Sequence, residues 1–469
     1  ALVLLVAPLV FSSNLSVTML TQMGIAIIAC LSYNILLGQG GMLSFGHAVY
    51  TGLGSFLAIH ALNSVSAGSL PLPVSLVPIV GGLAGVGFAV LFGYVTTRKS
   101  GTTFAMITLG LGELVFALSL MIPEFFGGEG GVSGDRMVGK PFMGITFGPQ
   151  VQVYYLIAVY TFISVALMFA FTRTPLGRML NAVRDNPERV EFVGYDTQRV
   201  RYIAFIIAGF FAGISGGLGA LNFEIVTAEV VGAARSGAYL LFTFLGGATF
   251  FFGPIIGGVL MVLASVLLSE LTKAWLLYLG LIFLFMVMYA PGGVASLIMM
   301  NVRVAAHGLL GRLWSSYLVL GVLGLLMLAG AGALVEMMYH LQLNAGSGNE
   351  LNYLGLTLDA GSAASWIAST AVALVALGLF EWVRRRFLKV WNEVQVIIEP
   401  DSRLKPEQQA IIETDYGMQE GRLMIETRGA LVQYVLQRYQ IDPTKVHAKA
   451  TAQQIVVANL DELQPWLYH

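Results

Sequence analysis

Six polar side chains lie in or beside stretches that are otherwise apolar, and they are the first candidates for chemistry. They are Asn34, Gln39, Ser44, His47, Thr108 and Glu113. No nucleophile with a base and no Cys/His set with metal-ligand spacing accompanies them, so we predict neither a catalytic residue nor a metal site. Polar groups in an apolar setting either satisfy hydrogen bonds or face a water-filled path. We predict that these six residues border a translocation path.

The sequence leaves an alternative role open for five of the six. Gly38, Gly40 and Gly41 interrupt the apolar pattern, and backbone freed there needs hydrogen-bond partners in a dry setting. The nearest polar residues could supply such partners; they are Asn34, Gln39, Ser44 and His47. Glu113 could bond a neighbouring helix or contact a companion subunit instead.

A second set of candidates lies on a hydrophilic excursion over residues 174–195. Thr174 suits an N-cap and Pro175 suits the first helical position, while Pro187 and Gly194 bracket a second short helix. Apolar residues recur at helical spacing on one face of the first helix, and Arg184 lies off that stripe. The segment therefore predicts a short amphipathic helical hairpin.

Such a hairpin has two possible roles. Its apolar stripe could fill a groove on a partner, as a lever on a motor-driven membrane protein would, or the helix could lie on anionic headgroups. We predict that the hairpin couples to a partner through Thr174, Pro175, Leu176, Gly177, Arg178, Leu180, Arg184, Asn186, Glu188 and Gly194.

The surroundings of both sets are those of a membrane protein. Of 469 residues, 57% are apolar and 11% are charged, whereas soluble domains carry about 25% charge. The net charge of −1 gives no electrostatic footprint for nucleic acid, so we predict a lipid bilayer as partner and no nucleic acid.

Stretches long enough to cross a bilayer, about 20 mainly apolar residues each, recur along the chain. They cover residues 16–38, 42–62, 74–97, 101–122, 151–172, 202–222, 254–271, 274–290, 313–335 and 364–383. The runs 1–11 and 237–248 are short. We predict an all-α fold, a polytopic transmembrane helical bundle of about 10–12 spans, with a small cytoplasmic α+β tail.

Basic residues predict the orientation, because Lys and Arg gather in cytoplasmic loops. They cluster at 98–99, across 173–201, at 303–312 and from Arg384 to Lys389. If these clusters are cytoplasmic, the Gly-rich loop 123–150 faces the periplasm and the C-terminus lies in the cytoplasm. Glu224, Glu229 and Arg235 then fall in a periplasmic loop.

Charge density divides the chain. Residues 1–383 are sparsely charged, and residues 384–469 have the composition of a soluble domain. We predict a transmembrane core at 1–300, a two-helix transmembrane extension at 301–383 and a cytoplasmic tail at 384–469. The tail carries no catalytic constellation and is predicted to be a docking or regulatory appendage.

A possible internal repeat relates Gly40–Gly46 to Gly247–Gly253, because both place five residues between two glycines, the second after Phe. Duplicated halves with interrupted helices at matching positions are common in transporters. The match is short, and chance explains it equally well.

Four segments, in order, resemble permeases of the branched-chain amino acid ABC importers. Residues 38–48 are similar to the G-Q-x-S-x-G-H-A signature, with one extra residue before Ser44, and 104–109 resemble the F-A-M-x-T-L run of the M-type subunit. Residues 127–132 resemble the G-G-x-x-G-[LIV] element, and the excursion at 174–195 looks like the coupling loop. The resemblance covers about residues 16–300, and the chain departs from the family beyond them.

The resemblance implies a bacterial inner-membrane permease that pairs with an H-type companion. Two cytoplasmic ATPase subunits would drive the pair, and a periplasmic binding protein would deliver substrate. This chain has no G-x-x-x-x-G-K-[ST] motif, so ATP would be bound by partner subunits and the chain itself would hold no cofactor and be no enzyme.

Other functions stay open at this stage. Branched-chain or other hydrophobic amino acids are the family's usual cargo, and urea, short amides or small aromatic acids are alternatives. An ion-coupled secondary transporter would need paired intramembrane charges, for which Glu113 alone is thin support.

Overall fold

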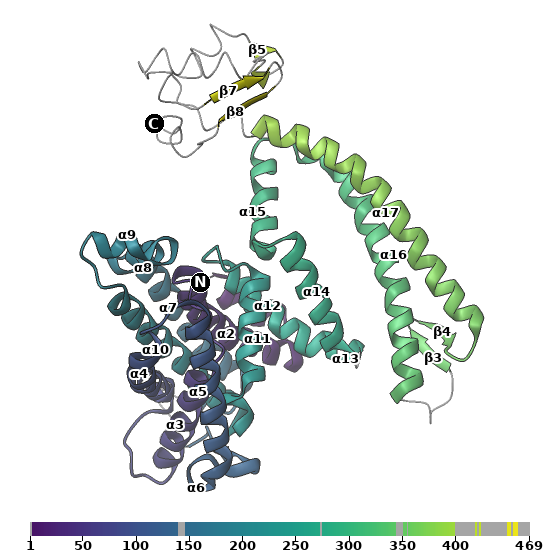
Figure 1. Ribbon diagram of the computed structural model, residues 1–469. Helices are drawn as coiled ribbons and strands as arrows, with labels where there is room; N and C mark the ends of the chain where they lie inside the picture. Colours follow the sequence, from purple (N-terminus) through teal and green to yellow (C-terminus); the bar gives the residue numbers. More distant parts are fainter. Residues whose placement is uncertain are drawn as a thin grey trace. The chain divides into compact units, whose positions relative to one another are not determined.

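Long apolar helices dominate the computed structural model (Figure 1), which describes residues 2–138, 146–272, 274–343, 350–353, 355–398, 418–419, 422–423, 448–451 and 454–457. The helices long and apolar enough to cross a membrane are α2 (Asn14–Asn34, continued by the π-helix η1, Ile35–Gln39), α4 (Val77–Thr96), α5 (Gly101–Met121), α7 (Gln150–Arg173), α10 (Thr197–Phe223), α16 (Leu310–Leu343) and α17 (Ala363–Ile398). The predicted all-α membrane fold is confirmed.

Within the described ranges these seven candidate spans become eight if α14 (Trp275–Tyr289) and α15 (Gly293–Ala306), bent by 52°, are one span. This is fewer than the 10–12 expected from the sequence. Several apolar runs form helices that are short or broken, such as α11 (Ala233–Gly246), whose 14 residues rise only about 21 Å.

The remaining elements are short. They are α1 (Leu2–Val10), α3 (Ala48–Ser66), η2 (Val74–Leu76), α6 (Pro123–Phe126), η3 (Gly128–Gly130), β1 (Val132–Ser133), α8 (Pro175–Asp185), α9 (Pro187–Phe192), β2 (Ile225–Val226), η4 (Ala228–Val231), α12 (Gly253–Leu263), η5 (Ala264–Leu268), α13 (Ser269–Leu271), β3 (Glu350–Tyr353), β4 (Leu356–Asp359), β5 (Met418–Gln419), β6 (Arg422–Leu423), β7 (Ala448–Thr451) and β8 (Gln454–Val457). The strands form four antiparallel pairs: β1 with β2, β3 with β4, β5 with β6, and β7 with β8.

The core of the bundle is built on close crossings of α10 with α3 and α4. A Cβ on Gly54 would lie 2.7 Å from the Cα of Gly213, and one on Gly81 would lie 2.6 Å from its carbonyl oxygen. Since small residues let helices approach in lipid, these glycines place α3, α4 and α10 in backbone contact.

The chain divides into two units, one of residues 1–301 and 335–361 and the other of 302–334 and 362–469. In the second unit α16 crosses α17 closely at Gly330, where a Cβ would lie 2.8 Å from the amide nitrogen of Ala373. Phe387 packs between Tyr317 and Trp391 there. The helical part of the tail expected from the sequence lies outside the described residues, apart from the end of α17.

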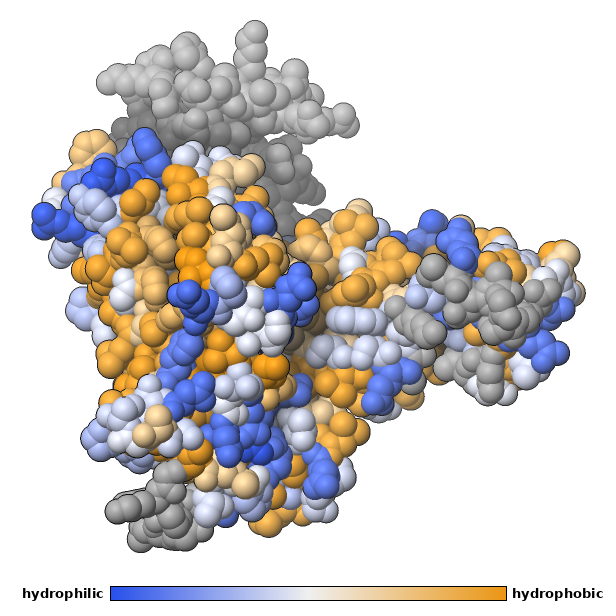
Figure 2. Space-filling model, turned by 90° about the horizontal axis from the view of Figure 1, so that it is seen from below, coloured by the Kyte–Doolittle hydropathy of each residue, from blue (hydrophilic) through white to orange (hydrophobic). Residues whose placement is uncertain are grey.

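In the first unit α8 and α9 lie at one end of the bundle and α6 at the other (Figure 1). The surface at the α6 end carries hydrophilic clusters within a largely hydrophobic exterior (Figure 2). This pattern fits a bundle whose flanks face lipid and whose ends face water.

Two segments of extended chain re-enter the bundle from opposite ends. Residues 40–47 fold back along α2 from the α8 end, because the Tyr33 hydroxyl donates to the Ser44 carbonyl oxygen (2.9 Å) and the Ser32 hydroxyl lies 2.9 Å from His47 Nε2. Residues 224–232 fold back from the α6 end, where β2 pairs with β1. The short helices α3 and α11 follow them.

The internal repeat suggested by the sequence stays a prediction, since both of its segments lie between two helices. Residues 247–252 form the turn between α11 and α12, whereas residues 40–47 precede α3.

Candidate functional site

The excursion after α7 folds as two capped helices, as its sequence predicts. The Thr174 hydroxyl accepts a hydrogen bond from the Gly177 amide (3.1 Å) at the start of α8, and the Asn186 side chain accepts one from the Arg189 amide (3.0 Å) at the start of α9. Capping bonds of this kind satisfy amides that a helix leaves free, so the hairpin is locally well defined.

The apolar stripe of α8 packs against the chain's own bundle. Leu180 and Val183 are buried in the main core cluster, with Leu176 and Met179 half-buried against it. The expectation that this stripe fills a partner's groove or touches headgroups is therefore wrong. Amphipathic spacing identifies the buried face of a helix and not the surface that buries it.

Arg184 ties the hairpin to the interruption after α2. Its Nη1 donates to the carbonyl oxygen of Gly38, its Nε donates to Asp185 Oδ1 (2.9 Å), and its aliphatic part covers Gly41. A cation on a carbonyl at the C-terminal end of a helical segment makes a charge-assisted bond, favoured also by the helix dipole. The α8 helix is thus in direct contact with residues 38–41.

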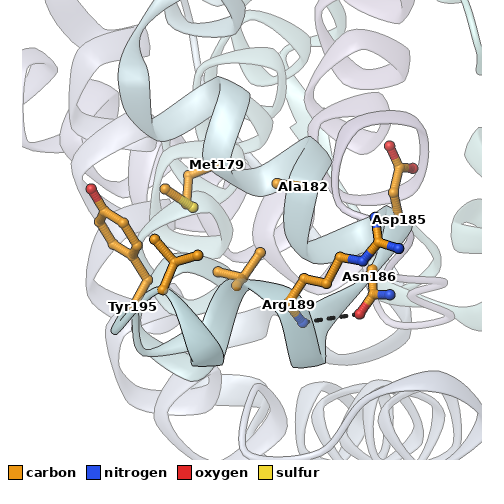
Figure 3. Close-up of a pocket in the computed structure, with 8 residues that line it drawn as sticks. Met179, Ala182, Asp185, Asn186, Arg189 and Tyr195 are labelled. Carbon is orange, nitrogen blue, oxygen red and sulfur yellow. Dashed lines mark hydrogen bonds between the residues drawn. The ribbon is translucent and has the colours of Figure 1, made fainter. Parts of the chain in front are cut away.

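The tip of the hairpin presents an apolar surface to solvent. Phe192 is 90% exposed and Val193 75% exposed. Beside them a cavity of about 370 Å³, shown in Figure 3, is lined by Met179, Ala182, Asp185, Asn186, Arg189, Val190, Val193 and Tyr195. An exposed apolar patch next to charged groups is typical of a protein-binding surface.

The other residues predicted for coupling divide between this surface and the hairpin's framework. Pro175, Arg178 and Glu188 are exposed. Gly177 is buried against the backbone of Phe171, and Gly194 has φ of +93°, a value that favours glycine.

Four of the six predicted path residues meet at the interruption between α2 and α3. Asn34, Ser44, His47 and Thr108 are all at most 2% exposed. The Thr108 hydroxyl accepts a hydrogen bond from the Phe45 amide (3.1 Å), which fixes α5 against the re-entrant segment. The predicted clustering of these side chains is present, and their role as a path stays a prediction.

Three side-chain atoms in this cluster lack a hydrogen-bond partner among the described residues: Asn34 Oδ1, Ser44 Oγ and His47 Nδ1. Buried polar atoms are normally paired, because an unpaired one costs about 1–3 kcal/mol. Unpaired atoms at an interrupted helix mark a place where the bundle can bind water or change its packing.

Gln39 and Glu113 lie apart from this cluster. Gln39 is half-buried at the end of η1, and Glu113 is on the exposed side of α5, while Thr108, Gly112 and Val115 form its buried side. Because a carboxylate is costly in lipid, the Glu113 face of α5 calls for a protein or water neighbour.

Arg235 was misplaced by the sequence analysis. It lies in the first turn of α11 and lines a cavity inside the bundle with Tyr239, Ser55 and Ser215, and it is not in a periplasmic loop. One sequence feature could have predicted a short helix here. The apolar run 237–248 is too short to span a membrane, and it follows Gly232, a residue suited to an N-cap.

The sequence is also similar to those of known proteins. A family model described as branched-chain amino acid transport system / permease component matches residues 15–291. The chain belongs to this permease family. It is 28% identical over 305 residues to the high-affinity branched-chain amino acid transport system permease protein LivM of Salmonella typhimurium, which covers 59% of this chain and 69% of that protein. LivM of Escherichia coli is also 28% identical, over 317 residues, covering 62% of this chain and 72% of that protein. No solved structure matches.

The permease match ends before the C-terminal extension, which has other relatives. Residues 393–463 match a model described as BrxR transcriptional regulator, C-terminal dimerization domain. A 76-residue stretch is 30% identical to the DNA-binding transcriptional repressor CapW of Stenotrophomonas maltophilia, covering 16% of this chain and 25% of that protein. The permease thus carries a tail related to part of a different class of protein.

Proposed function

We propose that this permease is the membrane-spanning subunit of an inner-membrane importer that moves branched-chain or other hydrophobic amino acids into the cytoplasm. An H-type companion permease would complete the pathway, and a periplasmic binding protein would deliver the solute. Two ATPase subunits would bind and hydrolyse ATP, so that this chain needs no cofactor and performs no catalysis. The C-terminus would lie in the cytoplasm, and nucleic acid would not be a partner.

The observation that carries the proposal is the bond between Arg184 and Gly38. A capped hairpin with an apolar, exposed tip at Phe192 and Val193 suits docking onto another protein. Its other side is bonded to Gly38 at the end of η1 and covers Gly41 at the start of the re-entrant segment. Force applied at the tip would therefore reach the interrupted helix, where a solute path can open and close.

Reconstitution tests this function. The chain, its companion permease and the ATPases would be purified together, placed in vesicles with the binding protein outside, and supplied with ATP inside. We expect leucine uptake that depends on ATP hydrolysis. Uptake driven by a proton gradient without ATPases would support the secondary transporter instead. ATP-driven uptake of urea or amides, without leucine, would assign the alternative cargo.

Glu113→Gln tests whether the exposed face of α5 borders the path. We expect uptake to fall about tenfold, since a carboxylate lost from a water-filled interface removes both its charge and its hydrogen bonds. Glu129→Gln, in the η3 turn beyond α6, is the matched control and should transport normally. Unchanged uptake in Glu113→Gln together with weaker binding of the companion permease would assign Glu113 to the subunit contact.

The tail match suggests that two copies of this permease associate through residues 393–463. We expect the full chain in detergent to have the mass of a dimer, and a chain ending at Ile398 to have half that mass at equal concentration. Mass photometry measures both. A full-length monomer would contradict the association, and a dimer of the shortened chain would move it to the helices.

A further inference from the structure

Helix α3, of 19 residues, and helix α11, of 14, begin side by side inside the bundle and run to opposite ends. The Ala48 amide at the start of α3 donates to the Ser236 hydroxyl in the first turn of α11 (3.0 Å). From there α3 reaches the α6 end, where the His60 ring lies 2.7 Å from the Phe125 carbonyl oxygen. By contrast α11 runs toward the α8 end, and its Thr243 hydroxyl donates to Cys30 (3.2 Å).

The positive ends of two helix dipoles therefore meet at one place. Half-helices whose N-termini face each other in a membrane are a known means of binding anionic groups of a solute. The two re-entrant segments supply this arrangement from opposite sides. A cavity lies beside the two helix starts.

The cavity lies among α3, α10, α11 and the segment 225–230. Its polar wall carries Arg235 and the Tyr239 hydroxyl. The hydroxyls of Thr51, Ser55 and Ser215 also line it, but each donates its proton to a backbone carbonyl oxygen, so Arg235 and Tyr239 are the donors left for an anion. Its other wall is aliphatic and aromatic, formed by Ile25, Phe223, Val226 and Val230. A wall of each kind suits a solute with one charged group and an apolar body.

Arg235 brings a positive charge to this cavity without an acidic neighbour to balance it. Its Nε donates to the Tyr239 hydroxyl (3.3 Å), and no carboxylate in the described part of the chain forms an ion pair with it. Glu224, the acidic residue at the end of α10, pairs instead with Arg136 (3.8 Å). The Arg235 side chain is reached by solvent, as expected of a group that faces a solute's route.

The exposed Arg235 guanidinium has no carboxylate partner among the described residues, so its remaining N–H donors are available to an anion. Carboxylates fit its fork of donors in a bidentate geometry. The space of about 40 Å³ takes a group of one or two water molecules' size. It has room for a carboxylate.

Gly219 keeps this space open. A Cβ at Gly219 would meet no atom within 4 Å, whereas one at Gly216, a turn earlier on α10, would overlap the Thr51 carbonyl oxygen. Gly216 therefore allows α10 to pack closely against α3. Gly219 lines the cavity and makes no packing contact.

We propose that Arg235, held at the meeting point of α3 and α11, binds the carboxylate of the solute as it passes through the cavity. The inference rests on the proposed transport function and narrows its cargo to carboxylates. Amino acids and small aromatic acids carry this group, and urea and neutral amides do not.

Arg235→Gln and Arg235→Lys test the charge in the assembled, reconstituted importer. We expect Arg235→Gln to lower leucine uptake at least tenfold, with subunits still co-purifying, and Arg235→Lys to restore part of it. Arg98→Gln, an exposed cation beside Tyr94, is the matched control and should transport normally. Uptake by Arg235→Gln within twofold of the unsubstituted importer would overturn the proposal.

Gly219→Leu tests the cavity without removing the charge. Its side chain enters open space, so we expect normal assembly and uptake at least tenfold lower. If Gly219→Leu takes up leucine as fast as Gly219→Ala does, the proposal is overturned. An importer that takes up no solute with ATP even without substitutions would instead refute the proposed function, which separates the two failures.

The purified complex without binding protein gives a direct readout. We expect 10 mM leucine to raise its melting temperature and 10 mM leucinamide, which lacks the carboxylate, to have no effect. The leucine shift should be absent in Arg235→Gln. Equal shifts for both compounds, or an undiminished shift in Arg235→Gln, would contradict carboxylate binding at Arg235.

Discussion

Arg184→Ala should lower ATP-driven uptake by roughly 10- to 100-fold while the complex still assembles. The substitution removes the charge-assisted bond to Gly38, and bonds of this class contribute about 1.5–3 kcal/mol. A change of about 1.4 kcal/mol is tenfold in an equilibrium, so the bundle would lose most of its response to the hairpin. The caps at Thr174 and Asn186 stay in place, so the hairpin should still fold and dock.

The measurement is uptake per ATP hydrolysed in vesicles. We expect the ratio to fall sharply in Arg184→Ala and to recover partly in Arg184→Lys. Arg199→Gln, an exposed residue at the start of α10 that pairs only with Asp196 among described carboxylates, is the control. An unchanged ratio in Arg184→Ala would show that coupling runs by another route.

Gly216→Ala should destabilise the permease far more than Gly219→Ala, although the two sites lie three residues apart on α10. A Cβ at Gly216 would overlap the Thr51 backbone and contact the Ser55 hydroxyl (2.9 Å), and neither can move without separating α3 from α10. Overpacking of this kind costs about 3 kcal/mol. At Gly219 the methyl group enters open space, and alanine is the better helix former by about 0.5–1 kcal/mol.

Thermal unfolding in detergent compares the two. We expect Gly216→Ala to lower the melting temperature and the yield of monodisperse protein, and Gly219→Ala to leave both near the unsubstituted values. Equal melting temperatures would mean that α3 and α10 separate easily, which would contradict the tight crossing.

The sequence predicted best what local rules control. The apolar stretches became helices, and Thr174 with Pro175 began α8, because capping and hydrophobic length act within a few residues. Thr108, Gly112 and Val115 form the buried side of α5, as their spacing on a helix allows.

Those local rules do not predict which segments far apart in the sequence contact one another. The stripe around Leu180 gave a buried face without its partner, which is the chain's own core. Arg235 looked like a loop residue because α11 is too short for a hydropathy window. Its cavity exists only because residues 224–232 return into the bundle beside α3, a contact between segments some 180 residues apart.

The account depends on the hairpin tip lying in the cytoplasm against an ATPase subunit. Cys30 is buried, so a Cys30→Ala chain with Phe192→Cys offers one exposed thiol at that tip. We expect a short thiol crosslinker to join this chain to the ATPase in inside-out vesicles, and an impermeant maleimide to label the site only from the cytoplasmic side. Labelling from the periplasm, or no crosslink in a complex that transports, would contradict the central claim.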